Sequence, residues 1–194
     1  MEIIRELGAG LTSNWHIWLV SGVLVIAAVI DGVRLKVPNW LTFPFILSGW
    51  FVSVLLAISS GQPWWLGLAW SLFGTAVGLA LLLPLYAIGG MGAGDVKLLM
   101  GVGAWVHGSV TMYAFCVSAI VGAVLALLLV AVRGNWWRHY TQFWMILGEI
   151  SSIRDPNQLA ERAAARKSSM LLLPYGIPIA LGTILYFAWT GMLV

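Results

Sequence analysis

The chain has 194 residues, of which 61% are hydrophobic and only 9% carry a charged side chain. Soluble domains carry about 25% charged residues, so this composition excludes a soluble globular protein and indicates an integral membrane protein. The formal net charge is +3 and the basic residues fall between the apolar runs, which argues against nucleic acid as a partner. About six spans of roughly 20 residues each would leave little chain for a soluble domain. We therefore expect residues 1–194 to form a single membrane domain.

Six apolar runs are typical of helices that cross a membrane. They cover residues 15–30, 41–59, 64–88, 96–106, 109–132 and 171–193. The expected fold class is therefore all-α, a polytopic membrane protein with about six transmembrane helices. The fourth run is short, because eleven helical residues reach only about 16 Å. A glycine-rich stretch precedes it, and non-helical backbone at membrane depth survives only where it lines a buried or wet cavity. We expect such a polar cavity beside Asp95.

The longest segment between two runs covers residues 133–169. Aromatic and basic side chains mix at 135–140, and an apolar stretch follows at 143–147. This composition is typical of a helix that lies on the membrane surface. We predict an interfacial cytoplasmic helix here, which serves either as an anchor beside the bundle or as a lid or docking surface for substrate.

The distribution of Lys and Arg predicts the orientation of the chain. Nine of the ten basic residues lie in the segments 31–40, 89–97 and 133–168, and only Arg5 lies on the other side. By the positive-inside rule, these three segments face the cytoplasm and the N-terminus lies outside. Under this topology Asp31 and Asp95 lie at the same, cytoplasmic border of the membrane.

Asp31 and Asp95 are the leading candidates for functional residues. The chain has only seven acidic residues, and these two lie at the ends of apolar runs. A charged side chain at membrane depth costs several kcal/mol, so an acid there is by default a functional candidate. Asp95 also completes a Gly-Xaa-Gly-Asp motif with Gly92 and Gly94.

Two neighbouring aspartates can hydrolyse a peptide bond. The charged carboxylate takes a proton from the attacking water, and the protonated one donates a proton to the substrate. Such a pair titrates as a unit and shares one proton. Structural alternatives stay open. Asp31 would then be only a helix end, Asp95 an N-cap, and the two glycines sites of close helix packing.

Other catalytic classes fit the sequence less well. The three histidines, His16, His107 and His139, form no zinc-binding motif, and we interpret them as interfacial polar residues. The chain has a single cysteine, Cys116, which lies in an apolar run and provides no metal-binding pair. We therefore expect neither a metal nor a cofactor.

Three segments resemble the type IV prepilin peptidases, a family of intramembrane aspartyl proteases. The segment 31–39 (DGVRLKVPN) is similar to the family's first-aspartate segment. The segment 90–98 (GMGAGDVKL) closely resembles its second-aspartate motif, and 173–182 (LPYGIPIALG) resembles its C-terminal Pro/Gly patch. The three segments occur in the family's order and span most of the chain.

The resemblance implies that Asp31 and Asp95 are the catalytic pair, with Gly92, Gly94 and Lys97 as supporting motif residues. It implies an enzyme of the inner membrane that faces the cytoplasm and needs no cofactor. The implied partners are membrane lipid and a substrate, either a prepilin or a related pseudopilin, from which the enzyme removes a short basic leader peptide.

The resemblance also favours one branch of the family. The long members carry paired cysteines in an N-terminal cytoplasmic segment and a methyltransferase activity. Here the first run begins near Trp15, so we expect the short, cleavage-only type, as in tight-adherence pilus systems. The archaeal preflagellin peptidases are similar too. Presenilin-like proteases fit less well, because Ile30 precedes the first aspartate where they usually have Tyr.

Two other classes of function remain open. A transporter or proton-relay protein could also place carboxylates in a membrane, although transporter sites lie near the bilayer midplane between repeats. A noncatalytic assembly protein could use the segment 133–169 as its working surface, and both aspartates would then tolerate Asn. The sequence leaves the oligomeric state open.

Overall fold

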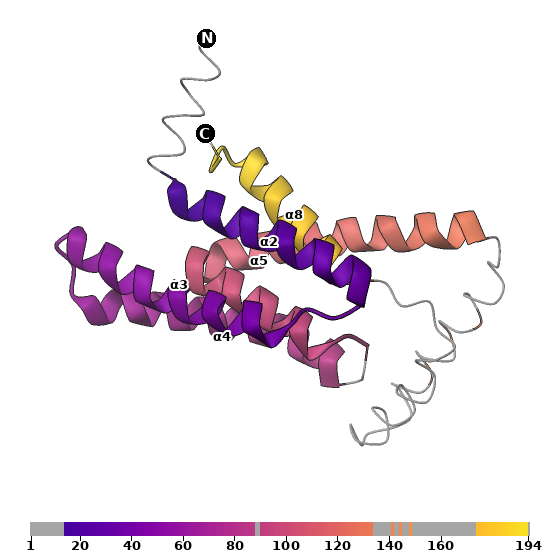
Figure 1. The fold of residues 1–194 in the computed structure, drawn as a ribbon, viewed down its shortest axis with the longest axis horizontal. Helices are drawn as coiled ribbons and strands as arrows, with labels where there is room; N and C mark the ends of the chain where they lie inside the picture. The colour runs from indigo at the N-terminus through magenta and orange to yellow at the C-terminus, as the bar shows by residue number, and fades with distance from the viewer. Residues whose placement is uncertain are drawn as a thin grey trace, which may run out of the picture.

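The computed structural model describes residues 14–87, 90–133 and 174–193, together with the isolated positions 141, 144 and 148. Within these residues the secondary structure is helical and contains no strand, which confirms the all-α class for the described part of the chain. Figure 1 shows how the helices are arranged. They are α2 (Trp15–Arg34), α3 (Asn39–Ser59), α4 (Trp64–Ala87), α5 (Ala93–Arg133) and α8 (Gly176–Trp189).

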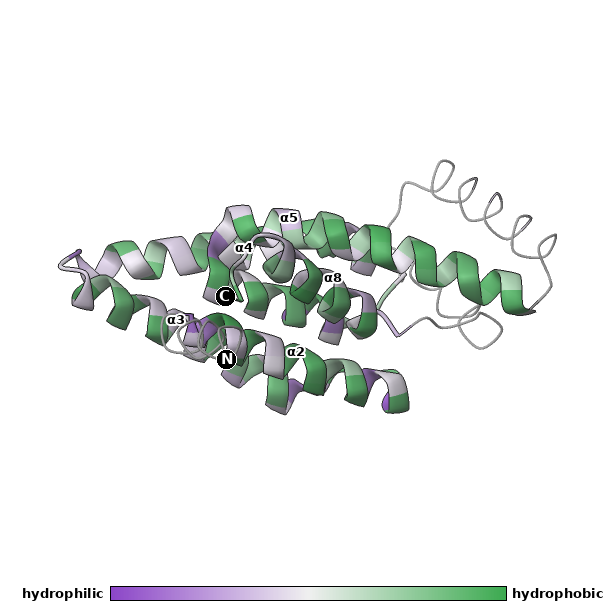
Figure 2. Cartoon of the chain, turned by 90° about the horizontal axis from the view of Figure 1, so that it is seen from above, coloured by the Kyte–Doolittle hydropathy of each residue, from purple (hydrophilic) through white to green (hydrophobic). Residues whose placement is uncertain are grey.

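Four of these helices, α2 to α5, are long and apolar enough to cross a membrane. The 20 residues of α2, for example, extend over about 30 Å, which matches the hydrocarbon core. Figure 2 shows that hydrophobic residues dominate along the helices. The chain is therefore a multi-pass membrane protein. The expected count of about six spans is not confirmed, because α8 has only 14 residues. The interfacial helix predicted within 133–169 falls outside the described ranges.

The two runs predicted at 96–106 and 109–132 belong to one element, α5, which is broken at His107. This residue has φ 65° and ψ 179°, a conformation that residues other than glycine rarely adopt. Such a conformation costs about 1–3 kcal/mol and persists only where the surroundings hold it. After His107 the second part of α5 runs back and extends beyond the other helices (Figure 1).

Hydroxyl groups from two neighbouring helices support the broken turn. A break in a helix interrupts the regular bonds from each N–H to the carbonyl four residues earlier. Ser53 of α3 and Ser71 of α4 both donate hydrogen bonds to the carbonyl oxygen of Ala104, three residues before the break. Side chains from neighbouring helices satisfy freed backbone groups in this way inside membranes.

Helix α4 packs against the first part of α5 through small residues. A Cβ atom on Gly74 would overlap with the carbonyl oxygen of Gly103, and a Cβ on Gly78 would lie 2.6 Å from the carbonyl oxygen of Leu99. Backbones come this close in membranes where both helices present small residues. This contact fixes the segment of α5 that begins at Ala93.

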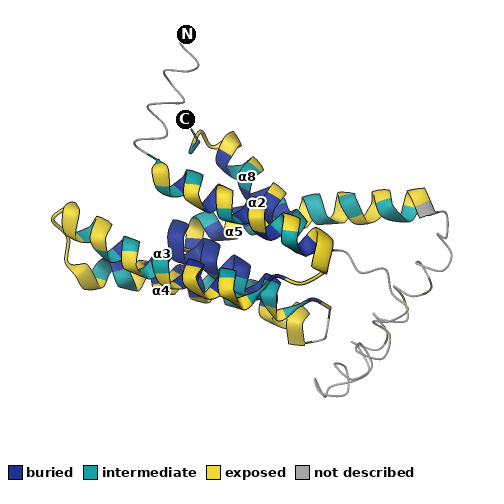
Figure 3. Ribbon diagram, in the orientation of Figure 1, coloured by how far each residue is buried: buried dark blue, intermediate teal, exposed yellow. Residues whose placement is uncertain are grey.

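Helix α8 packs against both α2 and α5. A Cβ on Gly182 would overlap with the backbone of Ser118 in the second part of α5, and the Ser118 hydroxyl donates to the carbonyl of Ile179 at 3.3 Å. Figure 3 shows buried residues concentrated where α2, α8 and the first part of α5 meet. The end of α2, the start of α5 and the start of α8 lie at one end of the bundle (Figure 1).

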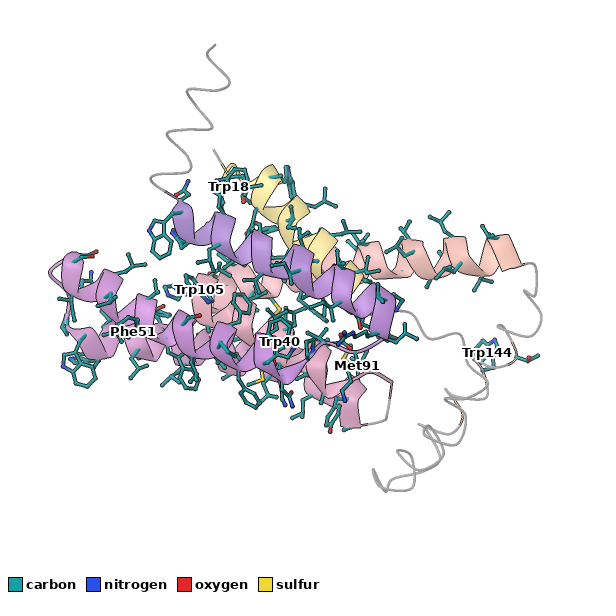
Figure 4. All side chains as sticks on the ribbon, viewed as in Figure 1. Trp18, Trp40, Phe51, Met91, Trp105 and Trp144 are labelled. Atoms are coloured by element: carbon teal, nitrogen blue, oxygen red, sulfur yellow. The ribbon has the colours of Figure 1, made fainter. Side chains whose placement is uncertain are left out.

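Aromatic side chains join α3 to this core without leaving their polar atoms unpaired. Trp105 lies between the helices (Figure 4), and its Nε1 donates to the carbonyl oxygen of Phe45 at 2.9 Å. The Nε1 of Trp50 donates to the hydroxyl of Thr75 at 3.0 Å. Both bonds link α3 to a neighbouring helix, so the indole groups fix its position as well as filling space.

The contact between α4 and α5 can be tested with a glycine pair. Gly74→Ala places a methyl group against the backbone of Gly103, so we expect it to lower the free energy of unfolding by about 1–3 kcal/mol. The control is Gly22→Ala in α2, where no atom lies within 4 Å of the added Cβ. We expect this control to be neutral or stabilising by up to about 1 kcal/mol. Unfolding by SDS in mixed micelles measures both, and equal effects would contradict the packing described here.

Candidate active site

Asp31 lies in the last turn of α2 and is 2% exposed. Its Oδ2 accepts a hydrogen bond of 2.7 Å from the backbone N–H of Gly176, at the start of α8. Buried carboxylates need such partners, because burial removes the water that would otherwise stabilise them. The partner comes from a helix remote in sequence, so this contact requires that α2 and α8 be assembled.

Asp95 is the third residue of α5 and is 7% exposed. Its Oδ2 accepts a hydrogen bond of 3.3 Å from the backbone N–H of Gly92, just before the helix. This contact is the side-chain half of a capping box, and a helix N-terminus favours negative charge. The sequence left open that Asp95 is only an N-cap. The structure shows a related role, because its carboxylate caps the N-terminus of α5 from the third helical position.

The glycine-rich segment before Asp95 rests on the turn between α2 and α3. A Cβ on Gly94 would lie 2.5 Å from the carbonyl oxygen of Val37 and 3.1 Å from its Cβ. Val37 is itself buried in the core. Gly94 therefore allows two backbone segments to touch, and this contact holds the segment after Asp31 against the segment that carries Asp95.

Lys97 ties the same two segments together. Its Nζ donates a hydrogen bond of 2.9 Å to the side-chain oxygen of Asn39, the first residue of α3. The same Nζ lies 4.5 Å from the centroid of the Phe43 ring, within the range of a cation–π interaction. These contacts link the start of α5 to the start of α3.

The turn that precedes α8 interacts with both carboxylates, with Asp31 by a hydrogen bond and with Asp95 through its charge. Tyr175 stands outside the four spanning helices, and burial raises its pKa, with the negative charge of Asp95 as the second cause. The next residue, Gly176, is the donor to Asp31. The turn at Tyr175 and Gly176 thus contacts one carboxylate directly and responds to the charge of the other.

Known proteins share the sequence that carries this site. A sequence model of the Type IV leader peptidase family matches residues 18–127, which include both aspartates. The chain belongs to this family. The prepilin leader peptidase/N-methyltransferase of Aeromonas hydrophila is 32% identical over 124 residues, which cover 60% of this chain and 40% of that protein. The protein of the same name from Aeromonas salmonicida (strain A449) is 29% identical over 135 residues, covering 64% and 44%.

The chain thus spans less than half the length of these curated relatives of the leader peptidase family. No solved structure gives a significant match. The segment matched to the family ends before the turn at 174–176. The contact of Gly176 with Asp31 therefore comes from the structure alone, and the sequence signalled this turn only through its Pro/Gly pattern.

The two histidines that the structure describes lie away from Asp31 and Asp95. His16 and His107 line a cavity of about 450 Å³ beside the turn between α3 and α4, at the other end of the bundle. His139 lies outside the described ranges. Among the residues that the structure describes, no group of three or more His, Cys, Asp or Glu side chains could hold a metal ion.

A double-mutant cycle tests the link between Lys97 and Asn39. Lys97→Met and Asn39→Ala should each lower the free energy of unfolding by about 1 kcal/mol, because each removes the same hydrogen bond. The double variant should therefore lose clearly less than the sum of the two. Lys36→Met, at an exposed position of the same turn, is the control and should stay within about 0.5 kcal/mol. Strict additivity of the two losses would argue against the contact.

Proposed function

We propose that this protein is a membrane aspartic endopeptidase that removes the short basic leader peptide from type IV prepilins or related pilin-like precursors. One observation carries the proposal: in a member of the Type IV leader peptidase family, two buried carboxylates lie at helix ends whose adjoining segments contact each other, Val37 against Gly94 and Lys97 with Asn39. Asp31 and Asp95 are the proposed catalytic pair. Gly92, Gly94 and Lys97 shape the loops around them.

The proposed reaction is hydrolysis by an activated water. The charged carboxylate of the pair takes a proton from water, whose oxygen attacks the carbonyl carbon of the scissile peptide bond. The protonated carboxylate donates its proton to the amide nitrogen as the C–N bond breaks. The products are the leader peptide with a new carboxylate and the mature precursor with a new amine. The chain's own carboxylates supply both proton transfers in this scheme.

The charge distribution supports a site at the cytoplasmic border of the inner membrane. Arg34 and Lys36 follow Asp31 directly, and Lys97 follows Asp95 by two positions. Basic residues gather on the cytoplasmic side of membrane proteins, so this end of the bundle faces the cytoplasm and the N-terminus lies outside. A basic leader would then stay in the cytoplasm while the apolar helix of the precursor lies in the bilayer.

A transporter or proton relay is the alternative use of two intramembrane carboxylates. Transporter sites lie near the bilayer midplane, with unwound helices on either side. Here Asp31 occupies the last turn of α2 and Asp95 the first turn of α5. Acids at helix ends at one end of the bundle suit a peptide bond at the membrane border better than a path through the membrane.

The proposal predicts that each aspartate is required for cleavage. In cells that co-express a candidate prepilin, wild-type protein should shorten the precursor on a gel. Asp31→Asn and Asp95→Asn should each slow this processing by about 100-fold or more, because each removes one proton-transfer group. Glu6→Gln, which removes a carboxylate outside the proposed pair, is the matched control and should process normally.

The outcomes separate the competing functions. Full processing by both Asn variants would refute the aspartic mechanism and return the two residues to a structural or transport role. Purified protein in proteoliposomes with a fluorogenic leader peptide excludes a contribution from other proteases of the host. Cleavage of a preflagellin but not of a prepilin would keep the mechanism and change the substrate.

A further inference from the structure

We propose that Gly176 is a positioning residue of the active site, whose backbone N–H fixes the carboxylate of Asp31 and whose missing side chain leaves room for it. The inference rests on the proposed function, because it takes Asp31 as one of the reacting groups. It assigns the start of α8, which lies beyond the segment matched to the family, a part in catalysis.

Gly176 and Asp31 lie close together, both in their hydrogen bond and in the space between them. The Gly176 N–H donates to Asp31 Oδ2 at 2.7 Å, within the buried part of the bundle. A Cβ on residue 176 would lie 2.9 Å from Oδ2, 3.0 Å from Cβ and 3.2 Å from Cγ of Asp31. Any side chain at this position would therefore push the carboxylate from its place. Glycine keeps the donor and removes the obstacle.

The backbone supplies this donor for a geometric reason. Gly176 is the first residue of α8, and the first N–H groups of a helix have no partner within the helix. In α8 this N–H is directed at a carboxylate of α2 and not at water. A backbone donor at the start of a helix cannot rotate away as a side chain can, so it restricts Asp31 more tightly than a flexible donor would.

Contacts along α8 hold Gly176 in place relative to Asp31. Ile177 packs against the same turn of α2, since its Cδ1 lies 3.5 Å from where a Cβ of Gly32 would stand. Six residues along α8 from Gly176, Gly182 lies against the backbone of Ser118. Catalytic groups need to be held within about 0.5 Å of the productive geometry, and rigid helices achieve this better than loops.

The decisive variant is Gly176→Ala, which keeps the N–H but adds the obstructing methyl group. We expect kcat for cleavage of a prepilin peptide to fall about 10- to 100-fold, since misplacing a reacting group by about 1 Å costs up to 10²-fold. KM should stay within about twofold, because the added methyl group is directed at Asp31. Both constants are measured with purified protein in detergent. Circular dichroism and the thermal midpoint show how much of each variant is folded.

Gly67→Ala in α4 is the matched control, because it is also a glycine that a methyl group would crowd. Its methyl group would collide with the backbone of Ser53 in α3, so it disturbs helix packing without contacting α8 or Asp31. We expect it to lower the thermal midpoint at least as much as Gly176→Ala does, while kcat per folded molecule stays near the wild-type value. If both variants lose kcat only in proportion to their loss of folded protein, Gly176 has a structural role alone and the inference is wrong.

A second readout does not depend on activity. Asp31→Ala removes Oδ2 and Cγ, so of the three close contacts of the added methyl group only the one with Cβ at 3.0 Å remains. We expect Gly176→Ala to lower the thermal midpoint in the Asp31→Ala background by less than half of its effect in the wild type. Equal effects in the two backgrounds would overturn the inference, even if the enzyme is active. If wild-type protein cleaves no precursor, the proposed function fails, and the positioning role in catalysis fails with it. A smaller effect of Gly176→Ala in the Asp31→Ala background would then show only that Gly176 and Asp31 are in contact.

Discussion

The rest of the structure depends on the burial of two carboxylates in a bundle of apolar helices. Burying a charge or an unpaired polar group costs free energy, so each acid needs a hydrogen-bond donor in the protein. The chain provides backbone N–H groups as donors, from Gly176 for Asp31 and from Gly92 for Asp95. Gly92 lies only three positions before Asp95, but Gly176 is remote from Asp31, so the end of α2 and the start of α8 must converge. The start of α5 joins them through the contact of Gly94 with Val37.

The break in α5 is what allows this convergence. The first part of α5 lies deep against α4, where Gly74 and Gly103 let the two backbones touch. At His107 the chain turns, and the second part of α5 returns toward the end where the helix began, carrying the surface against which α8 packs (Figure 1). The strained backbone at His107 is offset by hydroxyl groups from α3 and α4 that donate to Ala104. The strained conformation at His107 is therefore what allows the second part of α5 to reach α8.

The sequence predicts the parts of this arrangement that follow from local patterns. Apolar runs identify α2, α3 and α4 to within a few residues, and the rarity of acids singles out Asp31 and Asp95. The runs at 96–106 and 109–132 also match the two parts of α5 on either side of the break at His107. The sequence does not predict the hydroxyl groups that support this break, because they come from other helices. Nor does it predict the donor to Asp31, which lies 145 positions away and is a backbone N–H that every residue except proline possesses.

The contacts also relate the three sequence segments that resemble the prepilin peptidases. Val37 from the first segment touches Gly94 from the second, and the lysine of the second segment binds the asparagine of the first. Gly176 from the third segment binds Asp31. A proton relay needs a path between acids but has no need for a scaffold of turns at one end of the bundle. The proposed hydrolysis needs two carboxylates held in a fixed relation to a peptide bond, and contacts between the segments that carry Asp31 and Asp95 serve that need. This difference supports the proposed peptidase over the relay.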